Sequence, residues 1–532
     1  MVRTLFIGLD GATFHLLDEL TRELPGEGIT MPFLGRLLNQ GFRAQLRSTP
    51  NPLTPPAWVS LMTGRSPGTH GVYDFVRFED KGDEVFFTLY DARDIRAETI
   101  WSIVSRHGKR VVSLNFPMMA PPPAVNGCLL PGFTSWKHLR RNSHPEGLYE
   151  RIKAIPEFDP MELAWDFKRE SKIGEEMTQQ ELEAWVVHHL PRERQWFRIA
   201  ETLLREERPD LFAVMFDGTD KIQHQTWHVL DPNLRPEEPD ADYLRLRALC
   251  LDYFRRLDGY IEKLVEMAGP GVQVFLASDH GFTASTHVVR INRFLGEKGY
   301  LAWAQHGDSE FDRRREDANF AFLDWWKTLA FCPTPSSNGI YIRVASAPGR
   351  PGVRPEDYSA FRERLVADLR AWRLAETGEP VIRDVVVREE AFPGAAMGDA
   401  PDLILSLFDH GFVSVRNREP AVVRRNVVAG THHPLGIFAA AGPGVAAGGS
   451  ESLSILDVPT ILLRSLDLPV PEDFEGRTPD NLFTDRFLLD HPLKVERSQA
   501  FAVASDRSEE EISDAEKQKI MDQLRALGYL ED

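Results

Sequence analysis

Cysteine is scarce in this sequence. Only three occur in 532 residues, Cys128, Cys250 and Cys332, and they form no CxxC pair. The sequence therefore predicts neither a disulfide framework nor a cysteine-ligated zinc site. So few unpaired cysteines are typical of a protein in a reducing compartment.

Long apolar runs are also missing. No uninterrupted apolar stretch approaches the roughly 20 residues that are needed to span a bilayer. Residues 1–12 contain no apolar segment followed by a small-residue cleavage site, the pattern typical of a secretory signal. We therefore expect a cytoplasmic protein without a membrane segment.

An excess of basic residues is lacking as well. The chain has 62 lysines and arginines against 80 aspartates and glutamates, which gives a formal net charge of -18. This balance argues against a basic face that binds nucleic acid irrespective of its sequence. An anionic small-molecule substrate would need local positive charge, which bound metal ions supply.

Apolar β-rich runs alternate with helical patterns along the chain. This alternation is typical of βαβ units and a mainly parallel sheet covered on both faces. The best candidate strands are residues 4–9, 110–116, 211–216, 272–278 and 436–442. Three of them lead into an aspartate, Asp10, Asp217 or Asp279. Because ligands bind outside the carboxyl ends of strands in open α/β sheets, we expect these carboxylates to share a site.

Segments of different composition interrupt the candidate core, and we expect them to form a cap beside it because long connections in a compact fold are usually functional or structured. The predicted cap or insert segments are 135–190, 301–335 and 350–400. The predicted core consists of 1–134, 191–300, 336–349 and 401–490. Residues 491–532 are predicted to be a C-terminal extension with a short helix.

Three short patterns carry candidate metal ligands. Asp220 and His224 are four residues apart, so on a helix both project from one face, where they bind one cation or form an ordinary solvated surface. Asp279 and His280 follow a predicted strand and either reach one ion or form an ordinary turn. His432, in a Gly-Thr-His-His-Pro segment, is either a metal ligand or a structural histidine.

Together these patterns supply carboxylate oxygens and imidazole nitrogens, the ligand set that suits zinc or manganese. Two divalent ions would outweigh three ionised aspartates and leave a net positive site. Such a pair of ions can stabilise the attacking and leaving oxygens of an in-line displacement.

Thr54 has two interpretations. As structure, it is a helix N-cap whose oxygen accepts a backbone N–H, with Pro55 and Pro56 in the first turn. As chemistry, its hydroxyl is activated by a cation at a helix N-terminus and attacks phosphorus. Pro55 has no N–H, so the phosphoryl oxygens would have to be stabilised by ions or side chains.

Taken together, these motifs resemble the alkaline phosphatase superfamily and, within it, the type I phosphodiesterase/nucleotide pyrophosphatase family. The resemblance runs in order through FIGLDGATF, TPPAWVSLMTG, TDKIQHQTW, SDHGF and GTHHPLGIF and covers almost the whole chain. It implies an α/β fold of the alkaline phosphatase-like three-layer α/β/α type, with a mainly parallel central sheet and inserted cap segments.

The resemblance also implies roles for individual residues. Thr54 would be the nucleophile, and Asn115 and Asn338 are weaker candidates for contacts to the phosphoryl group. The implied cofactors are two divalent metal ions, zinc with manganese as the alternative. One ion would be held by Asp10, Thr54, Asp279 and His280, and the other by Asp220, His224 and His432, with Asp217 as a neighbour.

The implied activity is metal-dependent hydrolysis of a small-molecule phosphate ester, through a phosphothreonine intermediate. A phosphodiesterase or nucleotide pyrophosphatase is the first interpretation, and a phosphomonoesterase or phosphoryl transferase is the alternative within the superfamily. A protein that binds a phosphate ligand without turnover is a further alternative. A sulfatase is disfavoured because Thr54 does not lie in a Cys-x-Pro-x-Arg motif. The sequence does not indicate an oligomeric state.

Overall fold

The computed structural model describes residues 2–80, 85–134, 138–163, 177–304, 323–449 and 452–499. The helix predicted for the C-terminal extension lies outside these residues. So do residues 305–322 of the predicted insert 301–335.

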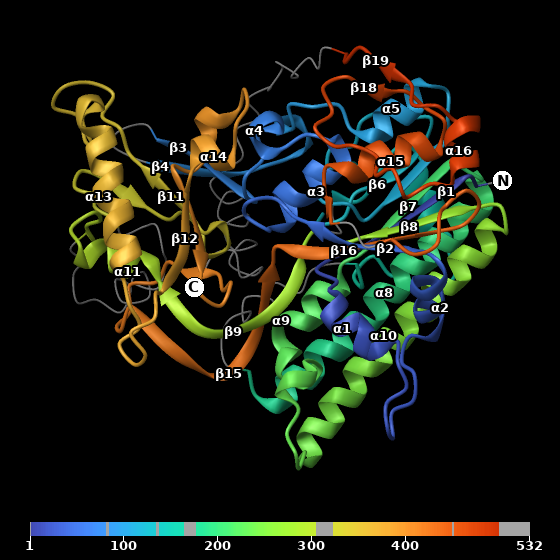
Figure 1. The fold of residues 1–532 in the computed structure, drawn as a ribbon, viewed down its shortest axis with the longest axis horizontal. Helices are drawn as coiled ribbons and strands as arrows, with labels where there is room; N and C mark the ends of the chain where they lie inside the picture. The colour runs from blue at the N-terminus through green and yellow to red at the C-terminus, as the bar shows by residue number, and fades with distance from the viewer. Residues whose placement is uncertain are drawn as a thin grey trace.

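An eight-stranded sheet forms the centre of the molecule (Figure 1), in the order β17-β2-β16-β8-β1-β7-β5-β6. Its strands are β1 (Thr4–Leu9), β2 (Phe42–Arg47), β5 (Val111–Leu114), β6 (Gly127–Leu130), β7 (Leu211–Phe216), β8 (Gln273–Ala277), β16 (Leu435–Ala441) and β17 (Leu453–Ser454). Only β16 runs antiparallel to its neighbours, and the remaining pairs are parallel. The mainly parallel sheet that the sequence predicts is therefore confirmed.

Helices cover both faces of this sheet. Alternate residues of β1 point to opposite sides, so that Leu5 and Ile7 join one hydrophobic cluster and Phe6 joins the other. The first cluster is completed by α1 (Phe14–Leu20), α2 (Pro32–Gln40), α8 (Gln179–Glu207), α9 (Gly218–Leu230) and α10 (Ala241–Ala268). The second is completed by α3 (Thr54–Thr63), α5 (Ile100–Arg106) and α15 (Asp457–Ser465). This arrangement is the predicted three-layer α/β/α fold.

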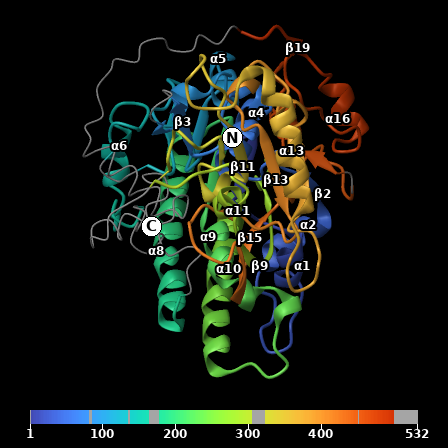
Figure 2. The ribbon, with the colours of Figure 1, turned by 90° about the vertical axis from the view of Figure 1, so that its left-hand side faces the viewer.

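A smaller body with its own hydrophobic cluster lies beside the central sheet and faces the viewer in Figure 2. Its sheet has the order β10-β11-β13-β12. The strands are β10 (Ala330–Phe331), β11 (Gly339–Ile342), β12 (Ile382–Val387) and β13 (Leu403–Leu407), and α11 (Ile291–Glu297) and α13 (Tyr358–Ala371) pack on them. The predicted division into core and inserts stays a prediction, but β11 and β13, from ranges predicted as core, pair in this sheet. Their apolar faces pack against α13 rather than against the large sheet.

A long antiparallel ribbon joins the two bodies (Figure 1). It consists of β9 (Gly281–Arg290) and β15 (Val422–His433). The short strand β14 (Val413–Ser414) pairs with β9 on the side away from β15. β9 begins four residues after β8, and β15 ends two residues before β16. The ribbon therefore starts at the edge of the central sheet where the candidate site residues lie.

The remaining elements are short. They are α4 (Pro67–His70), the hairpin of β3 (Val76–Asp80) and β4 (Val85–Leu89), α6 (Leu148–Lys153), α14 (Arg388–Ala391), α16 (Asp485–Asp490), and the pair β18 (Val470–Pro471) and β19 (Val495–Glu496). Among the described residues, no helix has both the length and the apolarity needed to cross a membrane.

Candidate metal centre and nucleophile

The first ligand group consists of Asp10, Asp279 and His280. Asp10 follows β1 and the other two follow β8, and these neighbouring parallel strands end at the same edge of the sheet. His280 Nε2 lies 3.4 Å from Asp10 Oδ1 and 3.3 Å from Asp279 Oδ2. All three side chains are buried. The structure therefore brings together three residues that the sequence predicts as ligands of one ion.

Hydrogen bonds on the outer side of this group set which atoms converge. Asp10 Oδ2 accepts from the Trp58 indole N–H at 3.2 Å, and Asp279 Oδ1 accepts from the Gly11 N–H at 3.2 Å. His280 Nδ1 donates to the Gly281 carbonyl at 3.0 Å. The other atoms, Asp10 Oδ1, Asp279 Oδ2 and His280 Nε2, are buried and have no hydrogen-bond partner among the described residues. Unpartnered buried polar atoms are costly, and a cation among them would satisfy all three.

The second ligand group consists of Asp220, His224 and His432. Asp220 and His224 lie one turn apart on α9, and His432 comes from β15. Asp220 Oδ1 is 3.3 Å from His224 Nε2 and 3.1 Å from His432 Nε2, and the two Nε2 atoms are 3.0 Å apart. His224 Nδ1 lies 3.1 Å from the Gly430 carbonyl, and His432 Nδ1 lies 2.7 Å from the Pro52 carbonyl.

These contacts decide which nitrogen of each ring is free to bind a cation. A backbone carbonyl only accepts, so Nδ1 carries a proton in both rings, and each ring in its neutral form presents Nε2 as an acceptor. Three acceptor atoms then face one another at hydrogen-bond distance with no proton between them. A cation relieves this conflict, and a carbonyl that accepts from the second ring nitrogen is typical of metal-binding histidines.

The two ligand groups adjoin each other. The rings of His280 and His432 stack with centroids 3.5 Å apart, and His280 Nε2 lies 4.0 Å from Asp220 Oδ1. The six side chains therefore form one continuous centre.

Burial determines the charge state of this centre when it holds no cation. Burial and the neighbouring carboxylates raise the pKa of Asp10 well above its usual value, and burial does the same to the pKa of Asp279. Burial lowers the pKa of His280 and of His432, so both rings are neutral at neutral pH. Burial opposes ionisation of Asp220, but its histidine neighbours outweigh that effect and its pKa is lowered. A divalent cation would favour the ionised carboxylates and the neutral rings together.

Thr54 is the first residue of α3, and Leu53 is the N-cap. The interpretation of Thr54 as an N-cap is therefore wrong, because no side chain caps this helix. Pro55 and Pro56 have no N–H, and the Ala57 N–H donates to the Leu53 carbonyl at 3.0 Å. No backbone donor of the first turn remains for the Thr54 hydroxyl.

Hydrogen bonds link the start of α3 to both ligand groups. Trp58, one turn after Thr54, bonds to Asp10, and the Pro52 carbonyl, two residues before Thr54, bonds to His432. Thr54 is 2% exposed. Residues on both sides of Thr54 in the chain are therefore bonded to the two candidate ligand groups.

The remaining predicted residues lie around the centre in supporting positions. Asp217 pairs with the buried Arg192 at 2.6 Å, and Asn115 Nδ2 donates to Asp217 Oδ1 at 3.1 Å. Asn338 Oδ1 accepts from the Val413 N–H at 2.9 Å, and its Nδ2 donates to the Gly411 carbonyl at 3.2 Å. Asp217 is thus engaged by Arg192, and Asn338 holds the loop whose Phe412 ring packs on His432.

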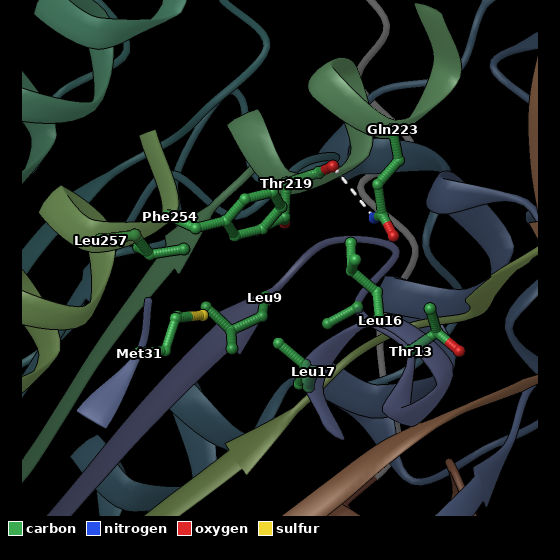
Figure 3. A pocket seen from close by; sticks show the side chains of 10 residues that line it. Leu9, Thr13, Leu16, Leu17, Met31, Thr219, Gln223, Phe254 and Leu257 are labelled. Atoms are coloured by element: carbon green, nitrogen blue, oxygen red, sulfur yellow. Dashed lines mark hydrogen bonds between the residues drawn. The ribbon is translucent and has the colours of Figure 1, made fainter. Parts of the chain in front are cut away.

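Sequence reasoning missed two residues beside the centre. Trp58 had a signal, because it lies four residues after Thr54 and so on the same face of α3. Gln223 had none. Its Nε2 donates to the Thr219 carbonyl at 3.0 Å (Figure 3). It also donates to the Gly11 carbonyl at 2.9 Å, which ties α9 to the residue after Asp10. The cavity in that view is otherwise lined mainly by apolar side chains, including Leu9, Leu16 and Leu257.

Two solved structures illustrate what this chain is similar to. Phosphonoacetate hydrolase from Sinorhizobium meliloti 1021, in complex with phosphonoformate, shares 15% identity over 87% of this chain and 96% of its own, with a TM-score of 0.53. An inactive murine ectonucleotide pyrophosphatase/phosphodiesterase 5 in complex with AMP shares 12% identity over 92% of this chain and 100% of its own, with a TM-score of 0.49. No curated protein matches the sequence.

Comparison with protein families is more specific. The family model described as type I phosphodiesterase / nucleotide pyrophosphatase matches residues 4–435, a range that contains both ligand groups and Thr54. The protein therefore belongs to the type I phosphodiesterase / nucleotide pyrophosphatase family and is a hydrolase of phosphoric esters.

Proposed function

We propose that this protein hydrolyses a small-molecule phosphodiester or nucleotide pyrophosphate, with Thr54 as nucleophile and two divalent cations, zinc or alternatively manganese. The observation that carries the proposal is the second ligand group, where Asp220 Oδ1 and two Nε2 atoms meet at 3.0 to 3.3 Å. With both rings in their neutral form, such a group of acceptors fits a cation. The cytoplasmic location expected from the sequence stays a prediction.

Each ligand group would hold one ion. Asp10, Asp279 and His280 offer two carboxylate oxygens and one imidazole nitrogen, and the second group offers one carboxylate oxygen and two nitrogens. Bound there, divalent cations would neutralise charge on the phosphoryl group and lower the pKa of a nearby hydroxyl. Thr54, at the start of α3, would be the fourth contact of the first ion.

The chain's own residues would then divide the reaction into two displacements. The Thr54 hydroxyl loses its proton and its oxygen attacks phosphorus in line, so that the bond from phosphorus to the leaving oxygen breaks and phosphothreonine forms. Water next attacks the same phosphorus from the opposite side, which releases the phosphate product and restores Thr54. Since Pro55 and Pro56 offer no N–H, the first turn of α3 adds little to stabilising the phosphoryl oxygens.

Replacing Thr54 by alanine tests the nucleophile. We expect Thr54→Ala to abolish hydrolysis of bis-p-nitrophenyl phosphate, because no other hydroxyl begins α3, while elemental analysis shows an unchanged metal content. Thr63→Ala is the matched control: Thr63 lies at the other end of α3, where its hydroxyl donates to the Val59 carbonyl at 2.7 Å. Unchanged turnover in Thr54→Ala would remove Thr54 from the mechanism. Assays with p-nitrophenyl phosphate in parallel separate a diesterase from a monoesterase.

A further inference from the structure

Trp58 makes the only side-chain contact among the three outer hydrogen bonds that orient the first ligand group. Asp279 and His280 are oriented by the backbone of Gly11 and Gly281, whereas Asp10 is oriented by the indole of Trp58. The indole is fully buried. Of the three orienting contacts, this is the one that a substitution can remove.

We propose that Trp58 is a positioning residue that sets the metal-binding oxygen of Asp10 and couples it to the nucleophile helix. Its N–H occupies Asp10 Oδ2, which leaves Oδ1 as the oxygen that faces His280 Nε2. Trp58 also lies one turn after Thr54 on α3. One rigid helix therefore sets the position of both the nucleophile and a metal ligand. This inference rests on the metal centre of the proposed function.

Gly8 leaves room for the indole of Trp58. Gly8 lies two residues before Asp10 in β1, on the same face of the strand. A Cβ on Gly8 would lie 2.6 Å from Trp58 Cη2 and 3.0 Å from Met215 Cγ. On its other side the indole meets the Phe116 ring edge to face, with centroids 5.4 Å apart. A side chain at position 8 would therefore displace the indole that bonds to Asp10.

Trp101 provides a matched control. It is also fully buried, and its ring packs against the same Phe116 with centroids 5.1 Å apart. Its indole nitrogen has no hydrogen-bond partner among the described residues. Exchange to phenylalanine removes the same atoms at both positions, but only at position 58 does it remove a bond to a candidate metal ligand.

The test measures zinc affinity by competition with a chromophoric chelator in the wild type, Trp58→Phe and Trp101→Phe. Loss of an outer hydrogen bond to a metal ligand typically costs about 10- to 100-fold in affinity. We expect a loss in that range for one zinc equivalent in Trp58→Phe, and less than about threefold for Trp101→Phe. Equal affinity in the two variants would overturn the inference.

Two further variants separate the inference from the proposed function. Asp279→Asn should lose one zinc equivalent. If the wild-type protein binds no zinc, the metal centre and this inference both fail. If Asp279→Asn loses one zinc equivalent but Trp58→Phe binds zinc as tightly as Trp101→Phe, only the inference fails. Gly8→Ala should weaken the same equivalent as Trp58→Phe, and adding it to Trp58→Phe should cost little more, because both changes break one contact. Additive losses would contradict this shared cause.

Discussion

At the residue scale, Glu193 of α8 shows how the layer behind the centre is built. Glu193 Oε1 accepts from the Gly218 N–H at 2.6 Å and from the Tyr253 hydroxyl at 3.1 Å, so the carboxyl joins α8, α9 and α10. Burial, and then the charge of Asp217, raises the pKa of Glu193 to about 8, against an ordinary value of 4.5. The side chain therefore keeps its proton at neutral pH.

This raised pKa predicts a pH-dependent effect of Glu193→Gln on stability. A group whose pKa is higher in the folded than in the unfolded state stabilises fully below its unfolded pKa, and this stabilisation is lost as the pH rises through its folded pKa. Relative to the wild type, Glu193→Gln should therefore gain stability between pH 5 and pH 8, by up to about 1.4 kcal/mol per pH unit.

Urea unfolding of the metal-free proteins at pH 5.5, 7 and 8.5 measures this difference. Glu201→Gln, at a partly exposed position of the same helix, is the control for the loss of a carboxylate from α8. A constant difference for Glu193→Gln would mean that Glu193 is ionised in the folded protein at neutral pH.

At the element scale, the close contact between α9 and β15 assembles the second ligand group. A Cβ on Gly430 would lie 2.3 Å from the Gln223 carbonyl oxygen and 2.6 Å from the Phe282 ring. The Gly430 carbonyl also orients His224. Glycine at this position lets the strand approach the helix closely enough for His432 to meet Asp220.

Gly430→Ala should therefore separate β15 from α9 and weaken one metal equivalent by at least about tenfold, the lower end of the usual cost of disturbing the support of a ligand. Calorimetric titration with manganese measures this. Gly259→Ala is the control, because Gly259 lies on the exposed side of α10 with no atom within 4 Å of its Cβ position. In a helix that exchange should stabilise by roughly 0.5 to 1 kcal/mol. If Gly430→Ala binds two manganese equivalents with wild-type affinity, the role given to Gly430 is contradicted.

The helices and strands also show which features of the fold a local sequence pattern can predict. Runs of apolar and β-branched residues identify β1 and β7 at their observed bounds, because each strand is buried on both faces. The aspartates at strand ends and the four-residue spacing of Asp220 and His224 are likewise short patterns, and they indicate the candidate ligand groups. The pairing of β11 with β13 joins segments about 60 residues apart, and Arg192 reaches Asp217 from another helix. Such contacts depend on the tertiary fold, so no short sequence pattern predicts them.

At the scale of the whole molecule, the candidate ligands come from distant parts of the chain, from residue 10 to residue 432, so bound cations would cross-link the central sheet, α9 and the ribbon. Binding to the folded state alone raises stability by mass action. The raised pKa values of Asp10 and Asp279 make protons compete with the cation at low pH. In the metal-free protein, the stabilisation that these two protonated carboxyl groups contribute is lost as the pH rises through their raised pKa values.

The rise in melting temperature caused by manganese should therefore be larger at pH 8 than at pH 6. Asp220, whose pKa is lowered, stays ionised throughout this range and contributes no slope. Differential scanning calorimetry of chelator-treated protein, with and without manganese, provides the measurement. The variant Asp10→Asn/Asp279→Asn is the control and should lose most of the pH dependence. A rise that is independent of pH in the wild type would contradict the competition.

The outer hydrogen bonds of the ligand groups have a consequence for how this enzyme evolves. The carbonyls of Gly281, Gly430 and Pro52 and the N–H of Gly11 keep their chemical identity whatever side chains mutation brings. Natural variation can alter these contacts only by moving the backbone, which selection for folding opposes. Trp58 is different, because a single codon change alters its bond to Asp10. Inherited differences in metal affinity among relatives should therefore concentrate at position 58 and at Gly8, which makes room for it.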